Sequence, residues 1–374
     1  MGVMNDLLGP PAVAGLRDVL ARAAGRPDWP ALAAAAERLE PLALRARADL
    51  LAAALLSDLS GQISGGGDGA GYRRAASVFR AALEDPQFTG WPIWPVSEAA
   101  VTLALRDGSA RSFDDALALL AELTPRLTSE FAIRRLLIGD LDRSLAIIAD
   151  WTRHPDGHVR RLASEGTRPY LPWAVRVPEI IARPAATLPL LDALHGDKSG
   201  DVRRSVANHL NDVARHAPDE VVAAAGRWSA DPGANTAWVV RHGLRTLVKK
   251  AHPGALALLG FTAGSVSVSI PELDRGTVHL PGELGFAVVV TNNSGEPARV
   301  AVDYLVHYVK ANGSLAPKVF KLAVAELAPG ESRQLSKTHA FRQMTTRVHY
   351  TGRHGIQVQA NGTLSAKAEF DVVS

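Results

Sequence analysis

Three acidic residues, Glu130, Glu165 and Asp212, lie in segments of helical spacing that are otherwise basic or apolar. Residues four apart share one face of a helix, and stacked helices can bring such faces together, so we expect Glu165 and Asp212 on one concave wall. Carboxylates gathered there could stabilise positive charge or direct a water molecule. The alternative is that Glu130 with Arg134, and Arg161 with Glu165, form ordinary surface pairs worth roughly 0.3–0.5 kcal/mol each. The spacing alone leaves both interpretations open.

An aromatic residue follows the second of these acids. Pro169 stops the preceding helix, so Trp173 is predicted on a short, rigid connection between helices. A tryptophan at this position either packs into the core or offers a stacking surface beside a ligand, because loops between rigid elements often carry function.

Several other kinds of chemistry lack support. The chain has no cysteine, which excludes thiolate catalysis, disulfides and Cys-ligated metal. His154 and His158 have the spacing of metal ligands, but Pro155 and Gly157 lie beside them and no HExxH motif accompanies them, so no metal site is predicted. No Gly-x-Ser-x-Gly motif supports serine hydrolysis. The glycine-rich segment 64–71 lacks the Lys-Ser/Thr of a phosphate-binding loop and is predicted to be a linker.

The helices that position the acids belong to a repeat. The sequence Asp-Gly-His-Val-Arg-Arg-Leu-Ala at 156–163 recurs 43 residues later as Ser-Gly-Asp-Val-Arg-Arg-Ser-Val at 199–206, and weakly 38 residues further on at 240–245. A period near 40 with two helices per unit is typical of HEAT repeats. The sequence therefore predicts an all-α, HEAT-like helical solenoid over residues 1–263.

Charge is distributed unevenly along the 374 residues, a length that indicates two or three domains. The net charge of +3 combines −4 in residues 1–125, +5 in 126–263 and +2 in 264–374. Basic residues that recur with the repeats either form a stripe that follows a polyphosphate backbone or pair with acids within and between repeats. These residues are Arg134, Arg135, Arg160, Arg161, Arg203, Arg204, Arg241, Arg245, Lys249 and Lys250.

The pattern changes after residues 260–264. Apolar residues now alternate with polar ones, for example over 266–270, 300–308 and 364–372, and turn signals separate these runs. The sequence predicts an immunoglobulin-like β-sandwich over residues 264–374, although the Cys…Trp…Cys core of true immunoglobulin domains is missing. The longest charge-free run, 253–271, is too polar to span a membrane, and no segment reads as a signal peptide. We expect a soluble, cytoplasmic protein of two domains, 1–263 and 264–374.

Long motifs along the chain carry a family resemblance. They are 127–134, 158–173, 202–212 and 241–250 in the helical part, and 303–313, 317–321 and 350–354 in the β part. Over residues 90–374 the chain resembles the AlkC family of DNA alkylation-repair glycosylases, which are HEAT-like repeat proteins related to AlkD. The resemblance implies a DNA-binding solenoid with an appended immunoglobulin-like domain.

The resemblance also implies an activity. It is hydrolysis of the N-glycosidic bond of cationic alkylated bases, such as 3-methyladenine and 3-methylcytosine, in double-stranded DNA, without base flipping and without a cofactor. Glu130, Glu165, Trp173 and Asp212 fall at the active-site positions of the family. Trp173 would pack against the deoxyribose, Asp212 would position water, and the two glutamates would supply negative potential.

Further DNA contacts follow from the same resemblance. Arg161 and Arg168 would hold phosphates beside the lesion, in a protein expected to act as a monomer near the nucleoid. In the β part, two interpretations are open for a group of basic side chains. They either contact the DNA backbone or enter the minor groove, or they are simply charged groups in solvent. These residues are Lys310, Lys318, Lys321 and His354. A different class of function is also open: a HEAT-repeat scaffold that binds DNA or protein without catalysis.

Overall fold

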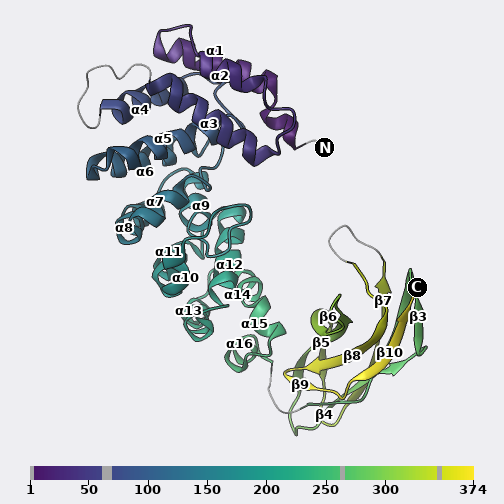
Figure 1. Ribbon diagram of the computed structural model, residues 1–374. Helices are drawn as coiled ribbons and strands as arrows, with labels where there is room; N and C mark the ends of the chain where they lie inside the picture. The colour runs from purple at the N-terminus through teal and green to yellow at the C-terminus, as the bar shows by residue number, and fades with distance from the viewer. Residues whose placement is uncertain (1–3, 61–69, 262–265, 343–347) are drawn as a thin grey trace. The chain divides into compact units, whose positions relative to one another are not determined.

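The computed structural model describes residues 4–60, 70–261, 266–342 and 348–374. The chain divides into two compact units (Figure 1): Met1–Glu220 with Arg227–Gly243, and Val221–Gly226 with Leu244–Ser374. The change from helices to strands falls between Leu258 and Val266. The domain boundary predicted between residues 263 and 264, and most of the glycine-rich segment 64–71, lie outside the described residues.

Helices occupy the first part of the chain and strands the second, which confirms the predicted fold class. The helices stack in series, as in a HEAT-like solenoid (Figure 1). They are η1 (Asn5–Leu8), α1 (Pro10–Ala24), α2 (Pro30–Ala36), α3 (Leu44–Ser60), α4 (Ala70–Leu83), α5 (Ile93–Asp107), α6 (Ala110–Leu123), α7 (Ile133–Gly139), α8 (Leu141–Trp151), α9 (Gly157–Glu165), α10 (Pro178–Ala182), η2 (Pro184–Thr187), α11 (Leu188–Leu194), α12 (Gly200–Val213), α13 (Pro218–Ala230), α14 (Thr236–Gly243), α15 (Arg245–Lys249) and α16 (Pro253–Leu258).

The repeat seen in the sequence corresponds to successive stacked helices. Helices α9 and α12 begin at Gly157 and Gly200, at the two copies of the motif, and α9 packs against α12, which packs against α14. The Asp156 side chain accepts a hydrogen bond from the backbone N–H of His158 and so caps the start of α9. The inner faces of these helices carry fully buried apolar side chains, including Leu162 and Val206.

One glycine sets the approach of α9 to α7. A Cβ atom added at Gly166, directly after α9, would lie 3.0 Å from the Ile133 side chain of α7 and 3.0 Å from the Leu162 carbonyl oxygen. A larger side chain would therefore push the end of α9, where Glu165 lies, away from α7.

The β part is a sandwich of two sheets. One sheet has the order β1-β4-β2 with β7 also paired to β4, and the other has the order β3-β10-β8-β5-β6 with β9 paired to β8. Pairing is antiparallel except for β10 with β3. The strands are β1 (Val266–Val268), β2 (Glu272–Leu273), β3 (Thr277–His279), β4 (Gly282–Asn292), β5 (Ala298–Val309), β6 (Leu315–Leu327), β7 (Ser332–Phe341), β8 (Gly352–Ala360), β9 (Thr363–Leu364) and β10 (Ala368–Val373).

Alternation along the strands builds the core between the sheets, as the sequence predicts. Phe286 and Val288 of β4 are buried together with Val300 and Val302 of β5 and Ile356 of β8. The predicted turn signals at 312–313, 329–330 and 361–362 lie at the β5–β6, β6–β7 and β8–β9 connections, where the glycines have positive φ. Within the described residues, no helix is long and apolar enough to cross a membrane.

Candidate active site

The three predicted acids are joined by two arginines into one continuous chain of ion pairs. An Arg161 guanidinium nitrogen lies 3.0 Å from a Glu130 carboxylate oxygen, and another lies 3.9 Å from Glu165. Arg168 in turn lies 2.6 Å from Glu165 and 3.0 Å from Asp212. We call these five residues the carboxylate chain. The structure thus brings Glu165 and Asp212 to the same arginine, as expected from the stacking of their helices, and Arg161 adds Glu130 to the group.

The ordinary surface pairs considered for the same residues do not describe this arrangement. Arg134 donates its hydrogen bonds to backbone carbonyls rather than to Glu130. Arg161 does approach Glu165 on the same helix, but its shorter contact is to Glu130, 31 residues earlier. Glu165 and Asp212 are 7% and 3% exposed, so their charges lie in an interior where they act more strongly than on the surface.

Helices α9 and α12 hold Glu165 through a network of neutral donors. The Ser205 hydroxyl of α12 donates to a Glu165 oxygen at 2.6 Å and lies 3.0 Å from the Ser164 hydroxyl. The His209 ring is fully buried, with Nδ1 2.8 Å from the Ser164 carbonyl oxygen and Nε2 2.9 Å from the Thr187 hydroxyl. Sequence reasoning missed Ser205 and His209, because only three-dimensional packing brings them against α9.

Burial and pairing set the charge states in the chain. Burial raises the pKa of Asp212, and the nearby Arg168 charge works in the opposite direction. For Arg168 burial favours the neutral form, but the charges of Glu165 and Asp212 outweigh it and raise the pKa of the guanidinium. Three carboxylates face two guanidiniums in these ion pairs, and the charges of Arg134 and Arg215 also act on Asp212. Fixed carboxylates of this kind can stabilise a cation that forms beside them.

Trp173 lies on the surface rather than in the core. Its side chain is 68% exposed, on the loop between α9 and α10, and its backbone φ of 61° lies in the left-handed region, which is costly for a residue with a Cβ. Its carbonyl oxygen accepts a hydrogen bond from Arg45 of α3 at 3.1 Å. Of the two interpretations of Trp173, the structure supports an exposed ring that is free to contact a ligand.

Arg134 fastens the loop that carries Trp173. The side chain is 0% exposed and donates to the carbonyl oxygens of Gly166 at 3.0 Å, Arg168 at 2.6 Å and Val175 at 3.0 Å. Burial lowers its pKa to about 10, so the side chain remains charged at neutral pH. The prediction that Arg134 contacts DNA is corrected, because a buried guanidinium committed to three carbonyl groups cannot reach a phosphate.

Three other predicted DNA contacts are also committed inside the protein. Arg160 is 6% exposed and makes a two-point ion pair with Asp197 at 2.6 and 3.1 Å. Arg168 is bound by the two carboxylates described above. His354 is 1% exposed, burial lowers its pKa, and its ring packs edge-on against Tyr308. The prediction that these three side chains contact DNA is corrected for one reason: their polar atoms face protein groups rather than solvent.

The remaining predicted basic residues are accessible to different degrees. Arg135, Arg161, Arg203 and Arg245 are half-buried, and Arg203 donates to the carbonyl oxygens of Asp197 and Lys198. The exposed set consists of Arg204, Arg241, Lys249, Lys250, Lys310, Lys318 and Lys321. Arg204 also pairs with Asp201 at 3.4 Å, where both side chains are largely solvated. Surface pairs of this kind contribute little to stability and can be exchanged for a ligand.

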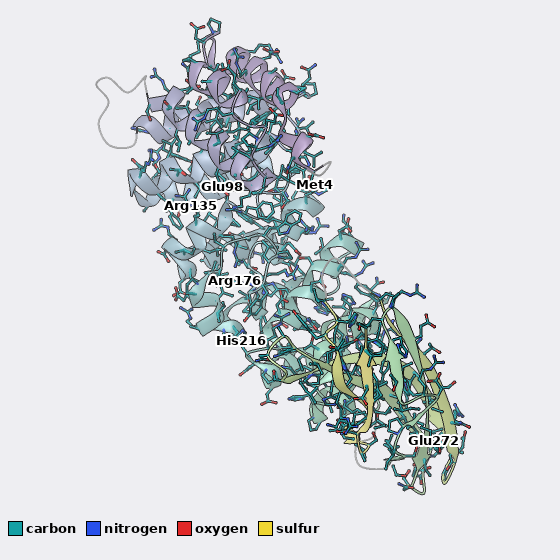
Figure 2. All side chains as sticks on the ribbon, turned by 45° about the vertical axis from the view of Figure 1, so that its right-hand side comes forward. Met4, Glu98, Arg135, Arg176, His216 and Glu272 are labelled. Atoms are coloured by element: carbon teal, nitrogen blue, oxygen red, sulfur yellow. The ribbon has the colours of Figure 1, made fainter. Side chains whose placement is uncertain are left out.

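A further buried carboxyl group, Glu98 of α5, escaped the sequence reasoning. Its oxygen accepts a hydrogen bond from the Trp94 indole at 3.2 Å, and the Trp94 ring stacks on Phe131 with 4.5 Å between centroids. Burial raises the pKa of Glu98, while the charges of Arg45 and Arg135 oppose the rise. Figure 2 shows Glu98 and Arg135 in the same part of the helical stack.

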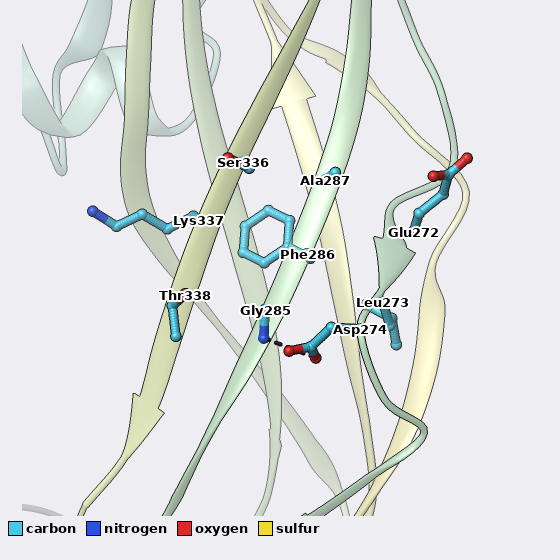
Figure 3. Close-up of a pocket in the computed structure, with 9 residues that line it drawn as sticks. All are labelled: Glu272, Leu273, Asp274, Gly285, Phe286, Ala287, Ser336, Lys337 and Thr338. Carbon is cyan, nitrogen blue, oxygen red and sulfur yellow. Dashed lines mark hydrogen bonds between the residues drawn. The ribbon is translucent and has the colours of Figure 1, made fainter.

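The β part has a surface hollow of its own. Glu272, Asp274, Phe286 and Lys337 are among the residues that line it (Figure 3), and an Asp274 oxygen accepts the Gly285 N–H at 3.0 Å. None of the predicted site residues belongs to this lining. Within the described part of the chain, no group of three or more metal-ligating side chains is placed to hold a metal ion.

Comparison with known proteins identifies relatives of both parts. A family model described as the C-terminal Ig-like domain of the uncharacterised protein YhaZ matches residues 267–374. The uncharacterized protein YhaZ of Bacillus subtilis is 34% identical over 261 residues, which are 70% of this chain and 72% of YhaZ. The solved structure of Pseudomonas fluorescens alkylpurine DNA glycosylase AlkC, bound to DNA containing an abasic site analog, is 30% identical with a TM-score of 0.81, and the match covers 100% of both chains. The chain is therefore a member of the AlkC family, with an Ig-like C-terminal domain.

Proposed function

We propose that this protein is a DNA glycosylase that hydrolyses the N-glycosidic bond of cationic alkylated bases, of the 3-methyladenine and 3-methylcytosine class, in double-stranded DNA. The observation that carries the proposal is the carboxylate chain, in which three acids converge on two arginines and Trp173 lies exposed five residues after Arg168. The likeness to AlkC bound to abasic DNA supports the same assignment.

The chemistry suits a site that is rich in carboxylates. An alkylated base that carries a positive charge takes up the bonding electron pair as the C1′–N bond breaks, and leaves as a neutral molecule. The sugar becomes oxocarbenium-like, and water then adds to C1′ and loses a proton. Fixed carboxylates stabilise this sugar cation electrostatically, as they do in glycoside hydrolysis. Since the leaving group is already activated, no general acid is required.

Within this mechanism the residues have separate tasks. Asp212 positions the water and accepts its proton, while Glu130 and Glu165 supply negative potential at the sugar. Trp173 packs its exposed ring against the deoxyribose, where the ring face also favours positive charge. The reaction proceeds without extruding the base into a pocket. Arg134 and Arg168 are positioning residues, because they hold the loop and the carboxylates rather than the DNA.

The basic side chains that are accessible to solvent bind the DNA phosphates. In the helical part these are Arg161 and the accessible arginines and lysines of the later repeats, Arg203, Arg204, Arg241, Arg245, Lys249 and Lys250. In the β part they are Lys310, Lys318 and Lys321. Phosphate contacts of this kind give affinity that falls steeply with salt. We further propose that the protein acts as a monomer, in the cytoplasm at the nucleoid.

The proposal is tested by release of free base. Duplex DNA treated with a methylating agent is incubated with the protein or with buffer, and the freed bases are separated and quantified. The proposal predicts release of 3-methyladenine, and of 3-methylcytosine from a duplex that contains it, well above buffer. Salt-dependent binding to the same duplexes without release above buffer would instead identify a non-catalytic DNA-binding scaffold.

A further inference from the structure

An exposed cationic cluster lies next to Asp212, on the loop after α9 and the end of α12. The guanidinium carbons of Arg176 and Arg215 lie 4.4 and 4.5 Å from the ring centroid of Tyr170. The His216 ring stacks on the same tyrosine with 5.6 Å between centroids, and its Nε2 lies 2.6 Å from the Tyr170 hydroxyl. Figure 2 shows Arg176 and His216 close together on the helical stack.

The two guanidiniums form no ion pair within 4 Å with an acid in the part of the chain that the structure describes. Arg176 and Arg215 are both exposed, and Arg176 donates to the Pro169 carbonyl oxygen at 3.3 Å. The face of the tyrosine ring attracts each cation electrostatically, so both guanidiniums are held at one aromatic side chain. An anion bound beside this ring would offset the gathered positive charge and could accept hydrogen bonds from the guanidinium groups.

The cluster is attached directly to the carboxylate chain. The backbone N–H of Arg215 donates to the backbone carbonyl oxygen of Asp212 at 3.2 Å. Burial raises the pKa of the Asp212 carboxyl, and the Arg215 charge and the Tyr170 backbone oppose the rise. Tyr170 lies three residues before Trp173 on the loop that Arg134 fastens. An anion held here would therefore lie beside the sugar whose positive charge the carboxylate chain is proposed to stabilise.

We infer that Arg176 and Arg215, presented by Tyr170, bind one phosphodiester of the DNA strand next to the nucleotide that loses its base. The inference rests on the proposed function for the identity of that nucleotide. The two arginines are positioning residues: they fix the sugar against Asp212 through the adjoining phosphate, and they do not touch the reacting atoms.

The test uses the full chain and a duplex with one neutral abasic-site analogue. Phosphates on either side of the analogue are replaced one at a time by uncharged methylphosphonates. Affinities are measured between low and moderate salt for the wild type, Arg176→Gln, Arg215→Gln and the double variant. Arg153→Gln is the matched control, because Arg153 is also exposed but lies on a different loop and pairs with Asp150.

The inference predicts roughly tenfold weaker binding by the double variant, and a salt slope smaller by about 0.9 for the lost phosphate. One methylphosphonate should weaken the wild type to a similar extent and have no further effect on the double variant. Single-turnover release at saturating enzyme should fall less than affinity. The inference is overturned if the double variant binds as Arg153→Gln does, if every methylphosphonate penalty persists in it, or if the wild type does not bind the duplex.

These outcomes are separate from those for catalysis. If wild type binds through the cluster but releases no base, the proposed glycosylase activity fails while the phosphate site stands. If wild type releases base and the double variant binds and reacts as the control does, the activity stands and the phosphate site fails. Thermal unfolding of each variant shows whether it is folded, and because both arginines are on the surface, we expect unfolding temperatures close to that of the wild type.

Discussion

The helical part and the β part bury polar side chains in different ways. In the helical part, buried Glu165, Asp212 and Arg168 are linked in one chain of ion pairs. In the β part, the buried His339 ring lies between two tyrosine hydroxyls, 3.0 Å from that of Tyr304 and 2.7 Å from that of Tyr308.

The β part also buries a carboxyl group, Asp303, but in a different setting. Burial raises its pKa, with the charges of Lys249 and Lys321 opposing the rise. No ion pair within 4 Å joins Asp303 to another described residue. Burial and a raised pKa are common to Asp212 and Asp303 and do not tell the two carboxyl groups apart. What distinguishes Asp212 is its link through Arg168 to Glu165.

The largest effect that we expect is on the rate of base release, and it should differ between substitutions of Asp212 and of Asp303. Asp212→Asn should lower the single-turnover rate of base release by about a hundredfold or more, the scale of losing one electrostatic contact to a transition state. Asp303→Asn, which neutralises an equally buried carboxyl group, should leave the rate within about threefold. Equal losses in the two variants would show that the assay reports damaged folding rather than chemistry, and full activity of Asp212→Asn would remove it from the site.

A second expected effect concerns stability and pH. Burial lowers the pKa of His209 to about 3, with the charges of Arg168 and Arg134 adding to the effect and the Ser164 carbonyl opposing it. The unfolded chain takes up this proton near pH 6.5 and the folded chain does not, so the stabilisation is complete above pH 6.5 and is lost as the pH falls toward 3. Between pH 6.5 and 5.0 the free energy of unfolding should fall by about 2 kcal/mol from this group alone.

Urea unfolding at several pH values, followed by helical circular dichroism, checks the contribution of His209. The pH-dependent loss should be smaller by that amount in His209→Gln, which is itself less stable, and unchanged in His158→Gln, whose side chain is exposed. An NMR titration should find the His209 ring neutral at pH 5. A ring protonated at pH 6 would contradict its burial between α9 and α12.

The next effect, about tenfold, concerns Trp173. Trp173→Gly removes the exposed ring and also the Cβ that makes the left-handed backbone costly. We expect base release to fall about tenfold, whereas the free energy of unfolding changes by no more than about 1 kcal/mol. Trp173→Phe should retain more activity because it keeps a ring. A loss of stability as large as that of a core tryptophan, about 3–5 kcal/mol, would contradict the exposed position.

The smallest effect that we expect is on DNA affinity, and it tests whether the β part contacts DNA. Neutralising one exposed lysine, in Lys318→Gln or Lys321→Gln, should weaken duplex binding only a few-fold and reduce the salt slope by about one unit at most. His354→Gln should instead lower stability, since its ring is buried among Tyr308, Phe341 and Phe370. If the salt slope is unchanged in both lysine variants, the two lysines do not contact DNA and their charges are solvated.

Much of the fold could be predicted from the sequence because periodicity reports it directly. The 43-residue repeat locates the starts of α9 and α12, and period-two alternation with turn signals locates the strands. The proximity of Glu165 and Asp212 was also predictable, because the helix faces that carry them stack in successive repeats, whereas the link to Glu130 was not predicted. The domain boundary and the catalytic roles remain predictions.

The partners of the arginines could not be predicted in the same way. Arg160 corresponds in the repeat to the more accessible Arg203, but its ion pair with Asp197 depends on how the loop between the two copies folds back. Arg134 lies outside the repeated segments and binds loop carbonyl groups. Arg215 meets Tyr170 across 45 residues, at a distance in sequence that no local pattern reports. His354 lies where β8 breaks its alternation, because Gly355 beside it is buried as well.

The central claim is that the carboxylate chain stabilises positive charge on the sugar. It is tested most directly with two duplexes that differ only at the abasic position, one carrying a neutral ring and the other a cationic pyrrolidine that imitates the charged sugar. Transition-state mimics of this kind bind more tightly than uncharged analogues when charge stabilisation drives catalysis. We predict that the wild type prefers the cationic duplex by about a hundredfold or more, and that Asp212→Asn loses most of this preference while Asp303→Asn keeps it. Equal affinity of the wild type for the two duplexes would contradict the claim.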